Sequence, residues 1–523
     1  MELKEVEKCC CVVTLNEAFS TQTSQSCSGV VVHPQTGTII CTGLPFSRFV
    51  TDPDQLSAEH TFLLPRSFSK KLKIRVIFPD VSHPVELYPP GSKPAHNREV
   101  SAQLVALFNC LEFEEAFQTL FQEADHWRFH GDEEDRELMR DARFLSWFAI
   151  LKTREKVDGL RSESIPWQSC SSLQKGDPVL ACGSPFGSLC LDLFISTLSR
   201  GIVSNLTGED NAVILTDARC LPGTEGGGVF VGKSTDVHLI GVIVSPFCWK
   251  ANEWIGLTLV CSVQSIFRNI IRCGSLQGLL WDVWPSPVQS SLCMSTMIHE
   301  SRVAKYPTVC LVESGSVWGS GVAVTPQLVV TCRHVVNGRL TVILKFHHNH
   351  RFLGIIGDVL FSTKPSSPYD LALIQMRDSV ADVVIPRMAK RFDQGDSAVV
   401  VGYGGMGPYC GPSLTSGIIS KAIRSKDQLV MLQTTCAVQS GASGGAVVQR
   451  DSGELLGIVS SNTRDLAAKV TYPHLNFIIP VTVFQRLLEQ FDLKKNINVF
   501  QELDATEAEV KKVWRLQGTK SKL

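Results

Sequence analysis

Residues 318–336 read WGSGVAVTPQLVVTCRHVV, and residues 27–42 read CSGVVVHPQTGTIICT. Each stretch opens near a Ser-Gly-Val, continues with alternating apolar residues, turns at Pro-Gln and ends in a second apolar run. Apolar residues with a period of two, interrupted by turn residues, predict a β-hairpin. The same hairpin is therefore present twice in one chain.

Two further pairs of segments repeat in the same order. Residues 178–204 and 398–420 each combine a short strand, a Gly-rich turn and a strand containing Gly-Ile. Residues 215–230 and 431–448 each carry a Gly-rich turn that leads into an apolar strand. Three matched blocks in one order indicate an internal duplication. Because the strands are short and separated by Gly and Pro turns, we expect two all-β units of the barrel or sandwich class.

The positions of the repeats set the expected domain boundaries. The first unit covers residues 1–275 and the second covers residues 301–493, with a linker at 276–300 that contains Pro and a Ser cluster. The first unit also holds an insertion at about 84–145, in which residues 103–124 have the apolar spacing of a helix. We therefore expect one of the two units to be interrupted by a partly helical segment.

The bulk composition limits the classes of protein to consider. The chain has 523 residues and a net charge of −1, which gives no general attraction to nucleic acid or to anionic membranes. Neither is expected as a partner. The 18 cysteines accompany a charged N-terminus, MELKEVEKCCC, rather than a secretory signal, so we expect reduced and buried thiols. No apolar run approaches the roughly 18 residues that a membrane-spanning helix needs.

The Gly-rich turn of the second unit offers a candidate nucleophile. Ser443 lies in Gly-Ala-Ser-Gly-Gly, residues 441–445, and a tight turn flanked by glycine can present a serine hydroxyl outward. The same turn aims the backbone N–H groups of Gly441 and Ser443 at one point. Two such donors stabilise the oxyanion that forms when an amide bond is attacked.

A candidate base and its partner precede this serine in the chain. His334 follows an apolar strand in VVTCRHVV, and the unperturbed pKa of histidine suits a general base. Asp370 opens an apolar strand in YDLALI, where its carboxylate could accept from the second imidazole nitrogen. The order His, Asp, Ser is the order of the chymotrypsin-type double barrel.

These motifs resemble those of trypsin-like serine proteases, close to the Deg/HtrA branch. TCRHVV, YDLALI and SGASGG carry the resemblance, and NFIIP at 476–480 adds to it. It implies two tandem chymotrypsin/trypsin-like double β-barrel units and a serine endopeptidase with His334 as base, Asp370 as its orienting partner and Ser443 as nucleophile. It implies no cofactor and no metal. Unlike most Deg/HtrA proteins, the chain has no room after residue 493 for a PDZ domain.

The C-terminal tail, residues 494–523, ends in an address signal. Ser521, Lys522 and Leu523 form the tripeptide that the peroxisomal import receptor recognises. Together with the duplication, this narrows the resemblance to peroxisomal processing proteases. That resemblance implies a homo-oligomer of the matrix that removes leader peptides from imported proteins, processes some matrix enzymes and cleaves itself.

The first unit lacks all three candidate catalytic side chains. Alignment of the repeats places Gly43 near the histidine position, Trp147 at the aspartate position and Glu225 at the serine position. None of these residues can do the job of the position it occupies, which is general base for Gly43, orienting carboxylate for Trp147 and hydroxyl nucleophile for Glu225. An independent site that uses Glu225 or Cys220 is the alternative. We expect a degenerate, pseudoprotease unit that packs, dimerises or presents substrate.

Substrate preference and self-cleavage are open on the sequence. By the resemblance, Ala437 lies at the floor of the primary specificity pocket, and its lack of charge predicts cleavage after a small or apolar residue, Cys included, rather than after Arg. Accessible loops are preferred sites of cleavage, so self-cleavage is expected within 89–145. Cys110 is one candidate there, on the pocket argument alone.

Several alternative interpretations stay open. The protease fold could serve a non-catalytic binding or chaperone protein, or Cys332 or Cys436 could be the nucleophile in place of Ser443. The C-terminal tripeptide could be accidental and the protein cytosolic. A metal site could use a cluster whose spacing matches no common zinc pattern, namely His347, His348, Asn349 and His350.

Overall fold

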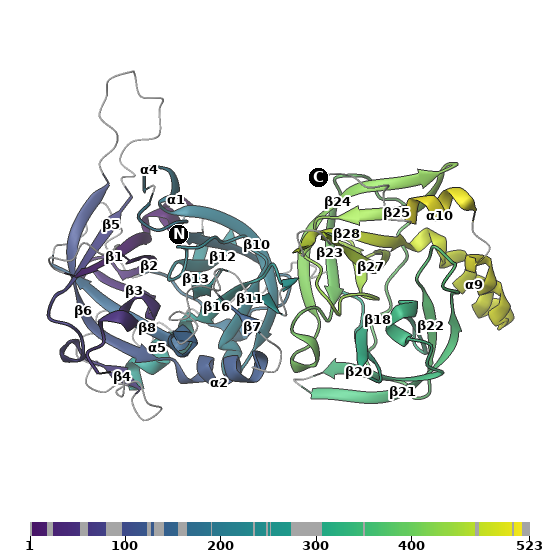
Figure 1. Cartoon of the computed structure of the whole chain (residues 1–523), viewed down its shortest axis with the longest axis horizontal. Coiled ribbons are helices and arrows are strands. Elements are labelled where there is room, and N and C mark those ends of the chain that lie inside the picture. Colours follow the sequence, from purple (N-terminus) through teal and green to yellow (C-terminus); the bar gives the residue numbers. More distant parts are fainter. Residues whose placement is uncertain are drawn as a thin grey trace, which may run out of the picture. The chain divides into compact units, whose positions relative to one another are not determined.

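A computed structural model gives the fold of the chain, which divides into two compact units (Figure 1). Unit 1 comprises Met1–Trp249 and Gly256–His299, and unit 2 comprises Lys250–Ile255 and Glu300–Leu523. The short segment Lys250–Ile255 thus belongs to unit 2, although the flanking chain belongs to unit 1. The residues that the structure describes are 3–17, 25–52, 61–79, 97–122, 127–129, 141–154, 165–189, 191–233, 236–246, 249–250, 253–272, 306–348, 351–465, 470–504 and 507–514.

The first sheet of unit 1 closes on itself. Its strand order is β4-β6-β5-β1-β2-β3-β8, and β6 also pairs with β8, so six of the seven strands form a ring. All of these pairings are antiparallel. The strands are β1 (Cys10–Glu17), β2 (Gln25–His33), β3 (Thr38–Thr42), β4 (Phe62–Leu63), β5 (Leu72–Phe78), β6 (Arg98–Asn109) and β8 (Trp147–Thr153).

A second closed barrel completes unit 1, with the order β10-β11-β16-β13-β12-β9. Its strands are β9 (Pro178–Gly183), β10 (Thr197–Thr207), β11 (Val213–Thr216), β12 (Gly228–Lys233), β13 (Asp236–Ser245) and β16 (Thr258–Ser262). The short strands β7 (Trp127–Arg128), β14 (Trp249–Lys250) and β15 (Glu253–Trp254) lie outside both barrels. The helices are α1 (Leu3–Lys8), α2 (Leu111–Leu120), α4 (Leu191–Phe194) and α5 (Val263–Arg272).

Unit 2 consists of two closed barrels, β17-β18-β19-β22-β21-β20 and β23-β24-β25-β28-β27-β26. The first contains β17 (Val309–Ser314), β18 (Val317–Thr325), β19 (Leu328–Thr331), β20 (Thr341–His348), β21 (Arg351–Ser362) and β22 (Ala372–Met376). The second contains β23 (Ser397–Gly402), β24 (Ser413–Ser425), β25 (Gln428–Thr434), β26 (Ala446–Gln449), β27 (Leu455–Asp465) and β28 (Val470–Pro480). The expected tandem of all-β double-barrel units is confirmed.

Few helices accompany these barrels in unit 2. The one-turn helix α8 (Arg333–Val336) follows β19, and the tail contributes α9 (Gln485–Lys494), the 3₁₀ helix η11 (Ile497–Asp504) and α10 (Ala508–Trp514). The tail packs on the barrels, since Trp514 Nε1 donates to the Val430 carbonyl at 3.0 Å. None of the described helices is both long and apolar enough to span a bilayer.

The helical prediction for residues 103–124 was only half correct. The helix α2 occupies Leu111–Leu120, but Arg98–Asn109 form β6, whose side chains alternate between exposed and buried over most of the strand. Pairing with β5 on one side and β8 on the other satisfies the backbone of β6, and this overrides the local helical spacing.

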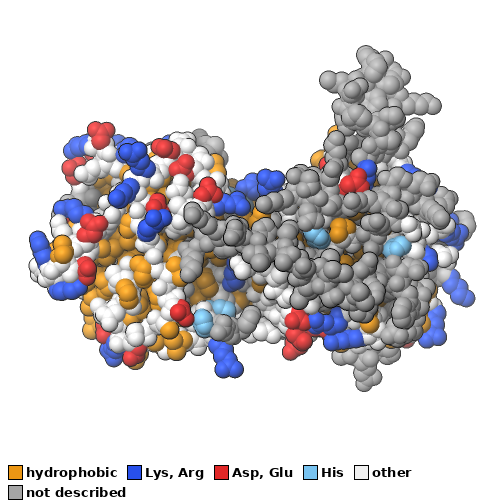
Figure 2. Space-filling view, turned by 180° about the vertical axis from the view of Figure 1, so that it is seen from behind, with side chains coloured by type: hydrophobic (Ala, Val, Ile, Leu, Met, Phe, Trp, Pro, Cys, Tyr) orange, Lys and Arg blue, Asp and Glu red, His pale blue; other side chains and the backbone are white. Residues whose placement is uncertain are grey.

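Unit 2 also exposes apolar side chains on the outer face of a hairpin. Ile343 on β20 and Ile356 on β21 are Cα partners, and they are 47% and 46% exposed. Leu340 and Leu353 nearby are more exposed still. Figure 2 shows apolar side chains in orange over this unit.

Candidate active site

The end of β19 delivers His334 to the site. All four residues of β19 are buried, and the chain then turns through extended Cys332 into α8. Val335 and Val336 are buried in this single turn, so His334 faces outward, with 47% of its side chain exposed. Asn337 ends the turn in the left-handed conformation, which asparagine tolerates better than most residues.

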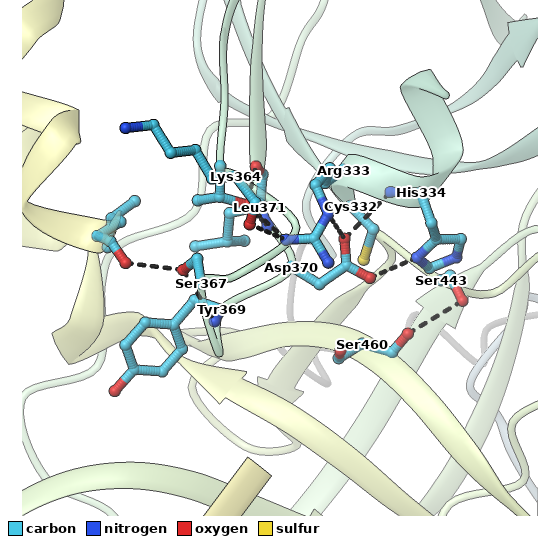
Figure 3. Close-up of polar contacts among 12 residues, drawn as sticks. Cys332, Arg333, His334, Lys364, Ser367, Tyr369, Asp370, Leu371, Ser443 and Ser460 are labelled. Atoms are coloured by element: carbon cyan, nitrogen blue, oxygen red, sulfur yellow. Dashed lines mark hydrogen bonds and ion pairs between the residues drawn. The ribbon is translucent and has the colours of Figure 1, made fainter. Parts of the chain in front are cut away.

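Asp370 meets this histidine just before β22 begins. The His334 Nδ1 atom lies 2.5 Å from Asp370 Oδ2, and the His334 backbone N–H donates to Oδ1 at 3.0 Å (Figure 3). The Arg333 guanidinium lies 3.8 Å from the same carboxylate. With the ring N–H on Nδ1, the other nitrogen, Nε2, is left free to act as a base.

The surroundings of Asp370 keep it ionised. Burial raises the pKa of this carboxyl, but the hydrogen bonds and charge of His334, together with the charge of Arg333, outweigh burial and lower it below its ordinary value of 3.8. A permanent anion on this side of the ring stabilises the imidazolium that forms during proton transfer.

Ser443 lies beside the His334 ring (Figure 3). Its Oγ donates to the Ser460 carbonyl at 3.2 Å. Within the described residues no hydrogen bond joins Ser443 Oγ to His334. In substrate-free proteases this contact is often long and tightens only when substrate binds. The structure therefore brings the three candidate residues, His334, Asp370 and Ser443, to one place.

The Gly441–Gly445 turn leaves two backbone donors free. Gly441 and Gly444 have φ of +94° and +85°, a conformation that glycine adopts without steric cost. A Cβ on Gly441 would also collide with the Trp318 ring and the Tyr403 carbonyl oxygen. The N–H groups of Gly441 and Ser443 have no acceptor in the described part of the chain, as an oxyanion site requires.

Ser320, which sequence reasoning did not single out, anchors this turn. Its Oγ donates to the Gly441 carbonyl and accepts from the Tyr403 N–H, both at 2.8 Å. Its own N–H donates to the Ser443 carbonyl at 2.8 Å. The available signal was the Ser-Gly-Val motif, which both repeats share and which places Ser320 next to the hairpin glycine.

Ala437 is buried at the other end of the loop that leads to Ser443. Its carbonyl accepts from Thr415 Oγ1 at 2.7 Å. The preceding carbonyl, of Cys436, accepts from Asn476 Nδ2 at 2.6 Å. Asn476 is buried, and its Oδ1 has no hydrogen-bond partner among the described residues, so this neighbourhood is polar.

The alternative nucleophiles are buried. Cys332 Sγ donates to the Val459 carbonyl at 3.2 Å, and Cys436 Sγ donates to the Ala398 carbonyl at 3.5 Å. Burial raises the pKa of the Cys332 thiol well above its usual range, and the charge of Asp370 adds to this effect. The reactive form of cysteine is the thiolate, so this environment disfavours Cys332 as a nucleophile.

One described group has the geometry of a metal site. Cys332, His334 and Asp370 each offer one ligand atom, and these atoms lie within 4.8 Å of one another. The group coincides with the His-Asp pair already described, in which the atoms are hydrogen-bonded. Of the histidine cluster considered as a metal site, His347 packs edge-on against the Phe352 ring, and Asn349 and His350 lie outside the described residues.

Unit 1 repeats the framework of this site without its chemistry. Ser28 Oγ donates to the Gly223 carbonyl and accepts from the Ser184 N–H, both at 2.8 Å, and the Ser28 N–H donates to the Glu225 carbonyl at 2.8 Å. These bonds match those of Ser320 one for one. They place Glu225 at the position of Ser443 and Gly223 at the position of Gly441.

The strand register aligns the remaining positions. Gly29 pairs with Cys41, which pairs with Ala149, just as Gly321 pairs with Thr331, which pairs with Ala372. Counting from these pairs places Trp147 at the position of Asp370. Leu44, adjacent to Gly43, falls at the position of His334.

The Glu225 carboxylate occupies the place where unit 1 would bind an oxyanion. The Gly223 N–H, equivalent to the free N–H of Gly441, donates to Glu225 Oε2 at 2.6 Å. Burial raises the pKa of this carboxyl to about 7, against the opposing effect of its backbone hydrogen bonds. The turn in unit 1 is therefore closed by its own side chain.

The closed barrels and the grouping of His334, Asp370 and Ser443 are those expected of a trypsin-like peptidase. A family model described as a trypsin-like peptidase domain matches residues 319–458. A crystal structure of a serine endoprotease from Yersinia pestis is 22% identical, covering 41% of this chain and 69% of that one, with a TM-score of 0.30.

Two curated relatives match almost the whole chain. The peroxisomal leader peptide-processing protease of Homo sapiens is 37% identical over 553 residues, 98% of this chain and 97% of that protein. The mouse protein of the same name is 37% identical over 554 residues, with the same coverage. The chain belongs to this family of peroxisomal serine proteases.

Proposed function

We propose that unit 2 is a serine endopeptidase of the peroxisomal matrix that removes N-terminal leader peptides from imported proteins. The observation that supports this most directly is the convergence of a carboxylate-oriented histidine, a serine and two free backbone donors. The substrate class is the one that the names of the two curated relatives give for those proteins.

The proposed reaction uses three side chains in sequence. His334 Nε2 takes the proton of Ser443 Oγ as this oxygen attacks the scissile carbonyl, and Asp370 stabilises the imidazolium. The Gly441 and Ser443 N–H groups bind the oxyanion of the tetrahedral intermediate. His334 then gives its proton to the leaving amine, which breaks the C–N bond and leaves an acyl-enzyme. Water, activated by the same histidine, hydrolyses this ester.

The environment of Ala437 supports a preference for a small or apolar residue before the cut. Ala437 carries no charge, and the side chains of Thr415 and Asn476, which bind the carbonyls of Ala437 and Cys436, are neutral and cannot pair with Arg or Lys. Burial of an unpaired arginine there would carry a large desolvation cost. Cys fits the same description and stays a candidate.

Three further proposals rest on the resemblance, and the first of them concerns residues outside the described ranges. Ser521, Lys522 and Leu523 are the proposed address for the peroxisomal import receptor. Self-cleavage is proposed within 89–145. If it occurs at Cys110, the start of α2 must open first, because Cys110 is fully buried and its N–H donates to the Ser146 carbonyl. A homo-oligomer is also proposed, with the exposed apolar hairpin β20–β21 as its contact surface.

One experiment tests the core of the proposal. Purified wild-type protein and Ser443→Ala are each incubated with a leader-bearing precursor, and intact masses of precursor and protease are followed with time. We expect only wild type to trim the precursor, and the product mass identifies the residue before the cut. Trimming by both proteins would return the cysteines as candidates, and strong preference for Arg would contradict the pocket assignment.

The same samples test the secondary proposals. A protease mass that falls with time in wild type but not in Ser443→Ala would support self-cleavage. A native mass equal to one chain for the Ser443→Ala protein would contradict the homo-oligomer. If neither protein trims the precursor, the result supports the alternative that the chain is a non-catalytic binding or chaperone protein.

A further inference from the structure

A short segment from the first half of the sequence is built into unit 2. Lys250–Ile255 belongs to unit 2, and the chain on either side of it belongs to unit 1. We call Lys250–Ile255 the bracing segment. Of its described residues, Glu253 and Ile255 contact the loop that carries Ser443, and Lys250 and Trp254 contact segments next to that loop. Nothing in the sequence motifs points to them.

The first contact is made by Glu253. The Ser440 N–H donates to both oxygens of the Glu253 carboxylate, at 3.0 Å and 3.2 Å. The other end of the same peptide group, the Gln439 carbonyl, accepts from the Ala442 N–H at 3.0 Å. The Gln439–Ser440 peptide group is therefore held both at its N–H and at its carbonyl. The acceptor for the N–H is a carboxylate, and hydrogen bonds to carboxylates are stronger than those between neutral groups.

The second contact is made by the main chain of Ile255. The buried side chain of Gln439 donates through Nε2 to the Ile255 carbonyl at 2.6 Å. The Ile255 side chain lies against Gly405, and a Cβ added to Gly405 would come within 2.7 Å of it. Lys250 Nζ donates to the Gly405 carbonyl at 3.1 Å. The segment thus ties Gln439 to the loop that follows β23.

A third contact reaches the start of the same loop. The Trp254 ring packs edge-on against the His474 ring, with centroids 5.7 Å apart. His474 Nδ1 lies 3.0 Å from the Thr435 carbonyl, at the end of β25. Residues 435–440 are therefore supported at both ends by contacts that lead back to the bracing segment.

The supported peptide directly precedes the oxyanion donor. The next peptide group, Ser440–Gly441, carries the free N–H of Gly441. The peptide group after it is held by Ser320, whose Oγ donates to the Gly441 carbonyl. Gly441 has φ of +94°, and glycine can rotate to other conformations at little steric cost. The orientation of this N–H consequently depends on anchors on both sides, and Glu253 supplies the upstream one.

We propose that Glu253 is a positioning residue for the oxyanion site of unit 2, and that the first half of the chain contributes to catalysis through the bracing segment. The proposal rests on the serine-protease function proposed above for unit 2. It gives the first half of the chain a role that needs no catalytic side chain of its own.

The test compares four variants of the full chain on one peptide substrate. Glu253→Ala removes the acceptor, Glu253→Gln keeps an acceptor oxygen, and Glu454→Ala removes a half-buried carboxylate elsewhere in unit 2, paired with Arg387 at 3.7 Å. Ser443→Ala reports whether the assay measures the proposed chemistry. The readouts are kcat and KM separately, the rate of reaction with a fluorophosphonate, and the thermal unfolding midpoint.

We expect Glu253→Ala to lower kcat about tenfold or more with little change in KM, since complete loss of one oxyanion donor costs roughly 100- to 1,000-fold. The fluorophosphonate rate should fall by a similar factor, while Glu253→Gln and Glu454→Ala stay within about threefold of wild type. Wild-type kcat in Glu253→Ala, or an equal loss in Glu253→Gln, would overturn the proposal.

Two safeguards keep the outcome interpretable. If Glu253→Ala does not fold, Gln439→Leu cuts the second contact to the segment and should lower kcat in the same way; unchanged kcat there would also overturn the proposal. Activity that persists in Ser443→Ala would instead refute the proposed function, whatever the Glu253 variants do. Loss of activity in Ser443→Ala with normal Glu253→Ala refutes only the positioning role.

Discussion

Replacement of Glu225 by glutamine tests whether the negative charge of this side chain destabilises the turn of unit 1 that corresponds to the Ser443 turn. The Glu225 carboxyl is half-buried, accepts from the Gly223 N–H at 2.6 Å, and has its pKa raised from 4.5 to about 7. Glutamine keeps an oxygen that can accept the same hydrogen bond but cannot ionise. The substitution therefore removes the charge and leaves the geometry in place.

The size of the effect follows from the raised pKa. A carboxyl whose pKa is higher in the folded protein than in the unfolded chain favours the folded state only while it is protonated. Wild type therefore loses stability as the pH rises from about 4.5 through 7. The gap between 4.5 and about 7, at about 1.4 kcal/mol per tenfold change in proton affinity, corresponds to roughly 3 kcal/mol at pH 8 and under about 1 kcal/mol at pH 5.

Local hydrogen exchange is the appropriate assay, because a chain of two units has no single free energy of unfolding. Peptides that cover β12 and β13 are followed by mass spectrometry at pH 5 and pH 8, with exchange rates corrected for intrinsic pH dependence. We expect Glu225→Gln to protect these strands more than wild type at pH 8 by up to roughly 3 kcal/mol, and hardly at all at pH 5. Glu99→Gln, which removes an exposed partner of Arg75, is the matched control. Equal protection of wild type and Glu225→Gln at pH 8 would refute the reasoning.

Two further predictions concern activity and import. Asp370→Asn should lower kcat/KM about 10⁴-fold while the fold is kept, because the amide oxygen still accepts from the His334 backbone N–H but the amide NH₂ group faces Nδ1 and selects the wrong tautomer. Asp358→Asn, which affects an exposed ion pair with Arg377, is the control. A loss under tenfold in Asp370→Asn would contradict the role of Asp370. Removal of Leu523 from an N-terminally tagged protein should abolish import, since the receptor reads the terminal tripeptide; unchanged peroxisomal fluorescence would show that another signal suffices.

Local patterns in the sequence were sufficient for the barrels and for the three candidate catalytic side chains. Strands such as β19 and β22 are short apolar runs bounded by turns, and His334, Asp370 and Ser443 each lie in a recognisable motif at the end of such a run or in a Gly-rich turn. The duplication could be recognised because both copies keep the same turn residues between the strands of the hairpin. The segment of β6 was misread as part of a helical insertion at about 84–145, because its apolar spacing also fits a helix. Pairing with β5 and β8 makes it a strand of the first barrel instead.

The supports of the site were decided by the tertiary structure. Ser320 reaches Gly441 across 121 residues, and Glu253 reaches Ser440 across 187. The shared Ser-Gly-Val motif marks Ser320 but not its partner, and no motif marks Glu253, since both contacts depend on how barrel closure brings distant segments together. Glu225 lies only two residues from Gly223, from whose N–H it accepts a hydrogen bond. This contact can be recognised as the closure of the turn only because the hydrogen bonds of Ser28 match those of Ser320 in unit 2. The sequence by itself thus determined which chemistry the chain could carry, because periodicity and motifs are local. The tertiary structure alone determined what holds that chemistry in place, because the hydrogen bonds involved join residues that only the fold makes neighbours.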